Sequence, residues 1–290
     1  MTLPEDREPG RVSSRRILLK IAYEGTNYSG WQYQENGRSI QAELEKAFRK
    51  LFGEMVRIHG AGRTDAGVHA LGQTAHCNIR NPLPIARLPE ALATVLPEAI
   101  AVTDAVEVEP DFDARRRAHR RTYCYRIADG FRPSVLERRF VTFVPYRLDV
   151  ERMRAAAALW IGKHNFSAFR GAGCTATRTV RDILEFTVDR VPNDQGRFGA
   201  GGLLFRVSSP AFLRHQVRIM IGTLVEIGRG RREPCWAREI LEEMDRRAAG
   251  PTAPPQGLVL EEVAYVPDPF RSSVNRREAR VPVGTVGGKI

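Results

Sequence analysis

The stretch GAGRTDAGVHALGQ, from Gly60 to Gln73, places four glycines around one cation, one carboxylate and one imidazole. Glycine adopts positive φ angles and allows close backbone approach, so the stretch predicts a tightly turned loop. Residues 55–58 and 74–79 on either side have the apolar, strand-like pattern of short β-strands. We therefore expect Asp65 on a rigid loop between two strands, a common position for a reactive group. The alternative is a turn residue whose carboxylate only accepts backbone N–H groups.

The elements around this loop predict an α+β fold. Residues 16–23 predict a strand, and Ser39 caps a helix that ends at Gly53, because apolar residues recur at helical spacing between them. A second helix near 88–96 and a strand near 100–108 complete the order β-α-β-β-α-β, which is typical of ferredoxin-like folds.

The second half of the chain predicts a similar order of elements, with no visible sequence identity to the first. The predicted elements are a strand at 122–128, a helix that Asp149 caps and that runs to Ile161, strands at 181–188 and 203–207, helices at 210–227 and 236–247, and a last strand at 258–265. We predict two ferredoxin-like (RRM-like) halves that form a continuous, mostly antiparallel central sheet with flanking helices.

The predicted boundaries follow from composition. Residues 1–15 are polar and rich in turn formers and predict a flexible leader, and residues 16–110 form the half that carries Asp65. Residues 111–268 form the second half, and residues 269–290 predict a disordered tail. Residues 193–202 also have the composition of a disordered segment.

The charge of the chain favours a polyanionic partner. Its 290 residues contain 45 Lys and Arg against 34 Asp and Glu, a net charge of +11. Such an excess indicates nucleic acid as a partner, although a basic surface without that role has the same composition. The four cysteines and six histidines lack the paired spacing of a zinc site or a disulfide framework. Neither a signal peptide nor an apolar run of about 18 residues is present, so we expect a cytoplasmic protein without membrane segments.

Asp65 is the first candidate for chemistry. A carboxylate can act as base, nucleophile or metal ligand, and Arg63 is the sequence-local cation that would favour its ionised form. No second carboxylate lies nearby, which argues against a two-carboxylate hydrolase and against a magnesium site. A single nucleophilic aspartate is the remaining interpretation.

A basic run forms the second candidate feature. Five of the seven residues 115–121 are arginines, and the run continues into a predicted strand that places Tyr123 and Tyr125 on one face. Arginines bind phosphates, and aromatic rings stack on bases that have left a helix. The alternative is core packing beside a solvated charge run, which we prefer for Tyr125 and not for Tyr123.

The third feature is an arginine pair in the apolar segment 212–222. Arg214 and Arg218 are i, i+4 neighbours on the predicted helix. Arg218 flanks the buried stripe, where an unpaired charge is costly, so it requires a carboxylate or phosphate partner. A structural salt bridge and a functional contact both satisfy this requirement. Residues 228–232 add a further candidate for phosphate binding.

Together these stretches resemble the tRNA pseudouridine synthase A family. The matching segments are Tyr23-Glu24-Gly25-Thr26 with Gly30-Trp31-Gln32, Gly62 to His69, Phe112-Asp113-Ala114-Arg115 leading to Tyr123, Asn165 to Arg170, Phe212 to Gly222, and Ala253 to Leu258. They follow the family order across residues 16–266. Glu24 stands where the family usually has Asp, Arg116 where an aromatic residue is common, and Gln216 where Met is frequent.

The resemblance implies that the protein isomerises uridine to pseudouridine at positions 38, 39 and 40 of the tRNA anticodon stem-loop. It implies a homodimer with a basic cleft that needs no cofactor and no metal. Asp65 would be the nucleophile, Arg218 would pair with its carboxylate, and Tyr123 would stack on the target base. Arg63 would help to hold the extruded nucleotide, and Leu258 would pack near the base. The alternatives are a pseudouridine synthase for another RNA and a non-catalytic RNA-binding protein.

Overall fold

The first half of the chain forms its elements in the predicted order. The computed structural model describes residues 14–130, 135–192 and 201–271. The elements are β1 (Arg15–Tyr23), α1 (Ile40–Phe52), β2 (His59–Gly60), β3 (His69–Ile79), α2 (Leu88–Ala93) and β4 (Ile100–Glu107). Ser39 caps α1 by accepting a hydrogen bond of 3.3 Å from the Ala42 N–H, and Gly53 ends it with a φ of +67°. Both predicted ends of this helix are confirmed.

The second half contains more elements than the sequence predicts. They are β5 (Ala118–Asp129), β6 (Thr142–Val144), α3 (Val150–Ala158), β7 (Gly162–Asn165), β8 (Val180–Ile183), β9 (Glu185–Val191), β10 (Gly202–Ser209), α4 (Gln216–Gly228), α5 (Trp236–Glu243) and β11 (Leu258–Tyr265). Short 3₁₀ turns cover residues 85–87, 167–169 and 255–257. Asp149 caps α3 as predicted.

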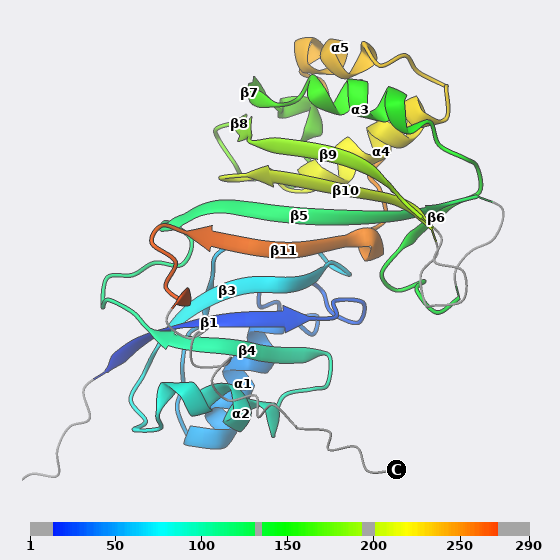
Figure 1. The fold of residues 1–290 in the computed structure, drawn as a ribbon. Helices are drawn as coiled ribbons and strands as arrows, with labels where there is room; N and C mark the ends of the chain where they lie inside the picture. The colour runs from blue at the N-terminus through cyan, green and yellow to red at the C-terminus, as the bar shows by residue number, and fades with distance from the viewer. Residues whose placement is uncertain (1–13, 131–134, 193–200, 272–290) are drawn as a thin grey trace, which may run out of the picture.

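One central sheet joins the two halves. Its strands follow the order β4-β1-β3-β11-β5-β10-β9, with β2 added beside β3 and β6 beside β5 (Figure 1). All these pairings are antiparallel except β3 with β11 and β5 with β6. Helices α1 and α2 pack at the β4 end, and α3, α4 and α5 pack at the β9 end (Figure 1). The predicted α+β class and the mostly antiparallel sheet are confirmed.

The strand predicted at residues 55–58 is wrong. The strand that precedes the Asp65 loop is β2, which begins after this stretch, and Met55 is 81% exposed. The Ile58 N–H donates to the carboxylate of Glu45 at 3.1 Å and not to a neighbouring strand. Glu54 likewise accepts from the N–H groups of residues 80 and 81. The following strand begins earlier than predicted, at His69, so the loop that carries Asp65 is short.

The strand predicted at 181–188 and the helix predicted at 210–227 are also corrected. Leu184 interrupts the strand, so that β8 pairs with β7 in a separate two-stranded sheet and β9 joins the central sheet. Helix α4 begins only at Gln216, because His215 has a positive φ of 61° and Gln216 accepts the Leu213 N–H at 2.8 Å. Arg214 therefore precedes the helix and is not a helical neighbour of Arg218.

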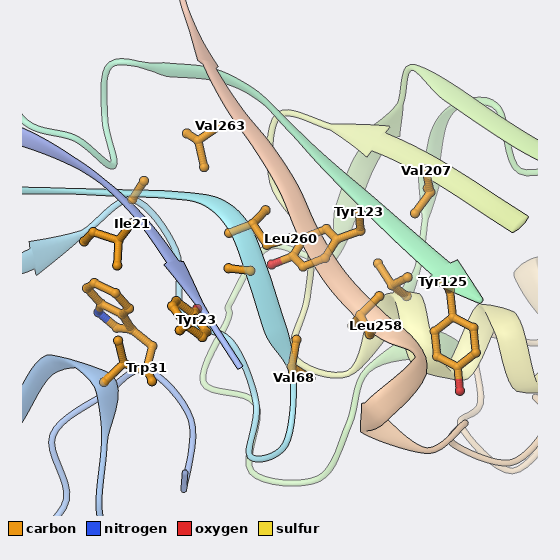
Figure 2. Packing of buried hydrophobic residues seen from close by; sticks show 14 of the residues in the cluster. Ile21, Tyr23, Trp31, Val68, Tyr123, Tyr125, Val207, Leu258, Leu260 and Val263 are labelled. Carbon is orange, nitrogen blue, oxygen red and sulfur yellow. The ribbon is translucent and has the colours of Figure 1, made fainter. Parts of the chain in front are cut away.

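Buried side chains of both halves form one hydrophobic cluster that reaches the Asp65 loop. Tyr23, Trp31 and Val68 lie on the β1 and β3 side, and Tyr123 and Leu258 lie on the β5 and β11 side (Figure 2). Val68 belongs to the loop and is 1% exposed. Burial of a side chain of this size contributes about 1.5 kcal/mol or more. The loop is thus fixed to the core three residues after Asp65.

Several predictions fall on residues outside the described part. Of the leader predicted at 1–15, the structure describes only residues 14 and 15, and Arg15 already begins β1. The tail predicted at 269–290 overlaps the described part at 269–271, where Phe270 is buried, and the segment predicted at 193–202 overlaps it at 201–202. Over the described ranges, no helix has the length and apolar character needed to cross a membrane. No group of three or more His, Cys, Asp or Glu side chains in those ranges could hold a metal ion.

Candidate active site

The loop between β2 and β3 presents Asp65 on a backbone that other segments hold in place. The Trp31 N–H donates to the carbonyl of Thr64 at 3.1 Å. The hydroxyls of Tyr23 and Thr64 share a hydrogen bond of 2.7 Å. Gly67 has a φ of +78°, and a Cβ there would lie 2.8 Å from the ring of Pro255. The glycine is thus required both by conformation and by the approach of the chain before β11.

Arg218 is the cation that pairs with Asp65. Its Nη1 donates to Oδ2 of Asp65 at 3.1 Å, and its Nε donates to the carbonyl of Ala253 at 2.8 Å. The side chains of Arg218 and Asp65 are 14% and 23% exposed. The pair is thus shielded from bulk water yet still reachable, and Ala253 fixes the direction of the guanidinium. A charge-assisted hydrogen bond of this kind is stronger than one between neutral groups and orients the carboxylate.

His215 is a second group at Asp65, to which the sequence analysis assigned no role. Its Nε2 lies 3.6 Å from Oδ2 of Asp65. Burial lowers the pKa of His215, and the nearby guanidinium groups of Arg218 and Arg214 lower it further against the opposing effect of Asp65. The imidazole is therefore neutral at pH 7. The prediction of a helix from residue 210 concealed this contact, since a helical His215 would not reach the loop.

Tyr123 lies in the middle of the sheet, with Leu260 of β11 and Val207 of β10 as its neighbours across the strands. Its ring packs edge-on against Phe212 with a centroid distance of 5.4 Å. The residue is 9% exposed, and burial raises the pKa of its phenol well above the usual range. Figure 2 shows the hydroxyl directed from β5 toward the first half of the chain. Tyr123 is thus a buried, neutral aromatic residue that is near enough to Asp65 for this carboxylate to contribute to the raised pKa of the phenol.

The other predicted site residues lie at different depths. Leu258 begins β11 opposite Tyr125 and is 4% exposed. Tyr125 is a packing residue, as preferred from the sequence, because its hydroxyl contacts Thr142 at 2.6 Å and the Pro254 carbonyl at 2.8 Å. Arg63 is exposed, and its side chain forms no hydrogen bond or ion pair with the described residues. The sequence-local partner proposed for Asp65 is therefore replaced by Arg218.

The basic run divides into outward and inward arginines. Arg120 pairs with Glu262 at 3.0 Å, and Arg117 pairs with Asp111 at 3.0 Å. Arg121 is buried, and it donates to the carbonyls of Ala61 at 2.7 Å, Arg115 at 3.0 Å and Pro210. These three carbonyls belong to the Asp65 loop, the basic run and the segment before α4. Arg121 therefore ties together the three stretches that the sequence analysis singled out, and it is not available to phosphate.

Replacing Arg121 with Met is expected to lower the free energy of unfolding by about 2–4 kcal/mol, because three carbonyls lose their charged donor. Urea unfolding followed by circular dichroism measures this loss. Arg115→Met is the matched control, since Arg115 is exposed and should change stability by less than about 0.5 kcal/mol. Equal stability of the two variants would contradict the assignment.

Residues 228–232, the other basic candidate, are engaged within the chain. Arg229 lies over the ring of Tyr146 at 4.1 Å and, like Arg231, pairs with the carboxylate of Glu226 on α4. Arg232 lies 4.9 Å from the ring of Trp236. These contacts account for the arginines of the patch without an external partner.

His76 on β3 fastens the turn that precedes the basic run. Its Nδ1 accepts the Ala114 N–H at 3.1 Å, and its ring stacks on His59 at 5.1 Å between centroids. Burial, followed by repulsion from His59, lowers the pKa of His76 to about 4. Its neutral form is therefore part of the folded structure near pH 7.

Acidification is expected to destabilise the protein through His76. The unfolded chain takes up this proton near pH 6.5 and the folded chain only near 4, so the free energy of unfolding should fall between these values. The contribution is about 3 kcal/mol. Chemical unfolding at several pH values measures it, and His76→Asn, which can still accept the Ala114 N–H, should show a shallower decrease. Parallel pH dependences in the two proteins would contradict the expectation.

Comparison with known proteins identifies the family. A family model described as tRNA pseudouridine synthase matches residues 20–115 and 156–266. The tRNA pseudouridine synthase A of Myxococcus xanthus is 46% identical over 272 residues, which cover 93% of this chain and 96% of that protein. The protein of the same name from Geotalea uraniireducens is 42% identical over 251 residues, or 87% of this chain and all of that protein.

A third relative, the tRNA pseudouridine synthase A of Rhodospirillum rubrum, is 43% identical over 251 residues, covering 86% of this chain and 87% of that protein. Among solved structures, an unknown protein from Galdieria sulphuraria aligns over 68% of this chain and 81% of its own. Its identity is 16% and its TM-score 0.20, too low to support a structural inference. The segments that the family model matches include the Asp65 loop and Arg218, and on these matches the chain belongs to the tRNA pseudouridine synthase family.

Proposed function

We propose that the protein converts uridine to pseudouridine at positions 38, 39 and 40 of the tRNA anticodon stem-loop, with Asp65 as the nucleophile. The observation that carries the proposal is the hydrogen bond between Asp65 and Arg218, which lie 153 residues apart in the sequence. Two of the family motifs thus supply one ionised carboxylate and its cation, with the aromatic Tyr123 on the same sheet. Membership of the family and the names of the relatives support the reaction and tRNA as its substrate.

The chemistry requires a nucleophile and little else. The N1–C1′ bond of uridine breaks and a C5–C1′ bond forms, while C5 loses a proton and N1 gains one. No electrons are gained or lost overall, so the proposal includes neither a cofactor nor a metal. A carboxylate can attack the ribose C1′ or the base C6, and in either route it must be ionised and shielded from water. Asp65 is partly buried, and its carboxylate pairs with the cation of Arg218, which supports this role.

The target base has to leave its stack before Asp65 can reach it, which costs a few kcal/mol. Stacking on an aromatic ring contributes about 1–3 kcal/mol per base and can offset that cost. We assign this contact to Tyr123, with Leu258 as apolar packing beside the base. Arg63, exposed on the same loop as Asp65, would contact the extruded nucleotide.

The proposal includes the architecture and assembly expected from the resemblance. The strand orders β4-β1-β3 with β2, and β11-β5-β10-β9, support two ferredoxin-like halves at residues 16–110 and 111–268. We also propose that the enzyme is a homodimer and acts in the cytoplasm. Sedimentation of the purified protein would test the dimer.

The direct test is to incubate the purified protein with a tRNA transcript that has uridines at positions 38 to 40 and to map pseudouridine. Conversion is expected at these positions, and a transcript with cytidine in their place is the control. Mapping cellular RNA with and without the gene distinguishes the alternatives. Pseudouridine lost only from another RNA would identify a different substrate. Binding of tRNA without conversion would identify a non-catalytic RNA-binding protein.

A further inference from the structure

Two groups contact the same oxygen of Asp65. Nη1 of Arg218 lies 3.1 Å from Oδ2, and Nε2 of His215 lies 3.6 Å from that atom. The described residues provide no hydrogen bond or ion pair to Oδ1. Among the described residues, the carboxylate is therefore held through Oδ2 alone. A catalytic contact of this length in a free enzyme often shortens when substrate binds.

The backbone at His215 is arranged to bring the ring to Asp65. His215 has φ 61° and ψ 2°, a left-handed conformation that few residues other than glycine adopt. Such conformations cost about 1–3 kcal/mol and persist where the surrounding structure enforces them, often at functional sites. Here the left-handed residue immediately precedes α4, which carries Arg218 three residues later. The bend at His215 therefore positions both side chains that contact Oδ2 of Asp65.

Gly171 makes room for the imidazole on the side away from Asp65. A Cβ at Gly171 would lie 2.5 Å from Nδ1 and 2.9 Å from Cβ of His215, so any side chain there would displace the ring. The Gly171 N–H donates to the carbonyl of Arg214 at 2.9 Å, which fixes this close approach. The ring is enclosed between a glycine and the carboxylate.

We propose that His215 is a positioning residue that acts through Asp65. As a neutral imidazole with its proton on Nε2, it holds Oδ2 together with Arg218 and presents Oδ1 to the target nucleotide. The inference rests on the proposed function, because it assumes that Asp65 attacks uridine. It adds a residue and an orientation of the carboxylate that the function alone does not contain.

The charged groups around the imidazole of His215 influence its protonation state. Asp65 faces it from the β2–β3 loop, Arg218 from α4, Arg214 from the preceding segment and Arg246 from the segment after α5. Burial and the three guanidinium groups favour the neutral ring, while Asp65 favours the cation. Protonation of His215 would place a second full positive charge beside Oδ2 of Asp65. The carboxylate would then be a weaker nucleophile. Activity should therefore decrease under acidic conditions, as His215 becomes protonated, and because its pKa is lowered this decrease should begin at a pH below that of an ordinary histidine.

The first test compares His215→Ala and His215→Asn in single-turnover reactions with prebound tRNA. The Ala variant should react about 10- to 100-fold more slowly, as expected for loss of one hydrogen bond to a charged group, with an unchanged Kd for tRNA. Asn tolerates the left-handed conformation and retains an N–H donor, so it should keep most of the rate. It does not titrate, so the decrease in rate on acidification should become smaller in this variant.

The second test uses Gly171→Ala, whose methyl group should displace the imidazole and slow the reaction by a similar factor. In the His215→Gly background, where there is no ring to displace, the same substitution should have little further effect. His164→Asn is the control, because His164 contacts the Ile161 carbonyl away from Asp65 and should leave rate and pH profile unchanged.

An unchanged rate in His215→Ala, or a pH profile of His215→Asn identical to that of the wild type, would overturn the inference. A loss of tRNA affinity with no change in rate would also overturn it and would assign His215 to binding. These outcomes differ from failure of the proposed function, in which the wild-type protein itself would form no pseudouridine.

Discussion

Asp65→Asn is expected to reduce pseudouridine formation by a factor on the order of 10⁴ or more, because the amide cannot act as a nucleophile in place of the carboxylate. The side chains are similar in shape, so Arg218 can still donate to the amide oxygen and the loop should keep its position. Affinity for tRNA should change by no more than a few-fold, because phosphate contacts supply most of the binding free energy. Single-turnover mapping of pseudouridine and a filter-binding assay measure the two quantities.

Asp189→Asn is the matched control for this variant. Asp189 pairs with Arg154 at 3.3 Å and is 58% exposed, so losing its charge should affect neither rate nor binding. The Asp65 variant must be checked by mass spectrometry, because deamidation would regenerate the wild-type residue. Wild-type turnover by intact Asp65→Asn protein would refute the nucleophile assignment.

Arg218→Met is expected to slow catalysis by about 10²- to 10³-fold, because the carboxylate loses the donor that orients it. The methionine keeps the apolar stem of the side chain against the core but leaves Asp65 and the Ala253 carbonyl without this partner. The free energy of unfolding should therefore also fall, by about 1–3 kcal/mol. Rates with saturating tRNA and urea unfolding separate the two effects.

Arg218→Lys distinguishes orientation from charge. A lysine supplies a positive charge but cannot donate from two fixed positions to Asp65 and Ala253 together. We expect it to restore stability in part and to leave the rate well below that of the wild type. A lysine variant as active as the wild type would show that charge alone is sufficient at this position.

The local features of the fold were predictable because short-range chemistry determines them. Ser39 and Gly53 have the residue types that helix ends require, and both ends of α1 lie where they were expected. The strand predicted at 55–58 failed for the opposite reason. The Ile58 N–H of this stretch donates to the carboxylate of Glu45, which lies on α1, and strand periodicity contains no signal for such a contact.

The candidate site was predictable to the extent that each residue had a local environment that required a partner. Arg218 flanked an apolar stripe and needed a counter-ion, which the structure supplies as Asp65. Arg121 and His215 were missed in different ways. Arg121 was indistinguishable in sequence from its solvated neighbours, and only the carbonyls converging from three segments set it apart. The contact between His215 and Asp65 depends on the left-handed backbone conformation of His215 itself, and hydrophobic periodicity does not indicate such a conformation.

The position of β11 has a consequence for biosynthesis. This strand lies between β3 and β5, pairing Val259 with His69 on one side and Leu258 with Tyr125 on the other, although it is the last strand described along the chain. A ribosome-bound chain that lacks it would expose β3 and β5 as unpaired edges and would have no ladder to join Asp65 to Tyr123. Premature termination should therefore yield an inactive fragment prone to aggregation, and catalysis should begin only after nearly the whole chain has been synthesised.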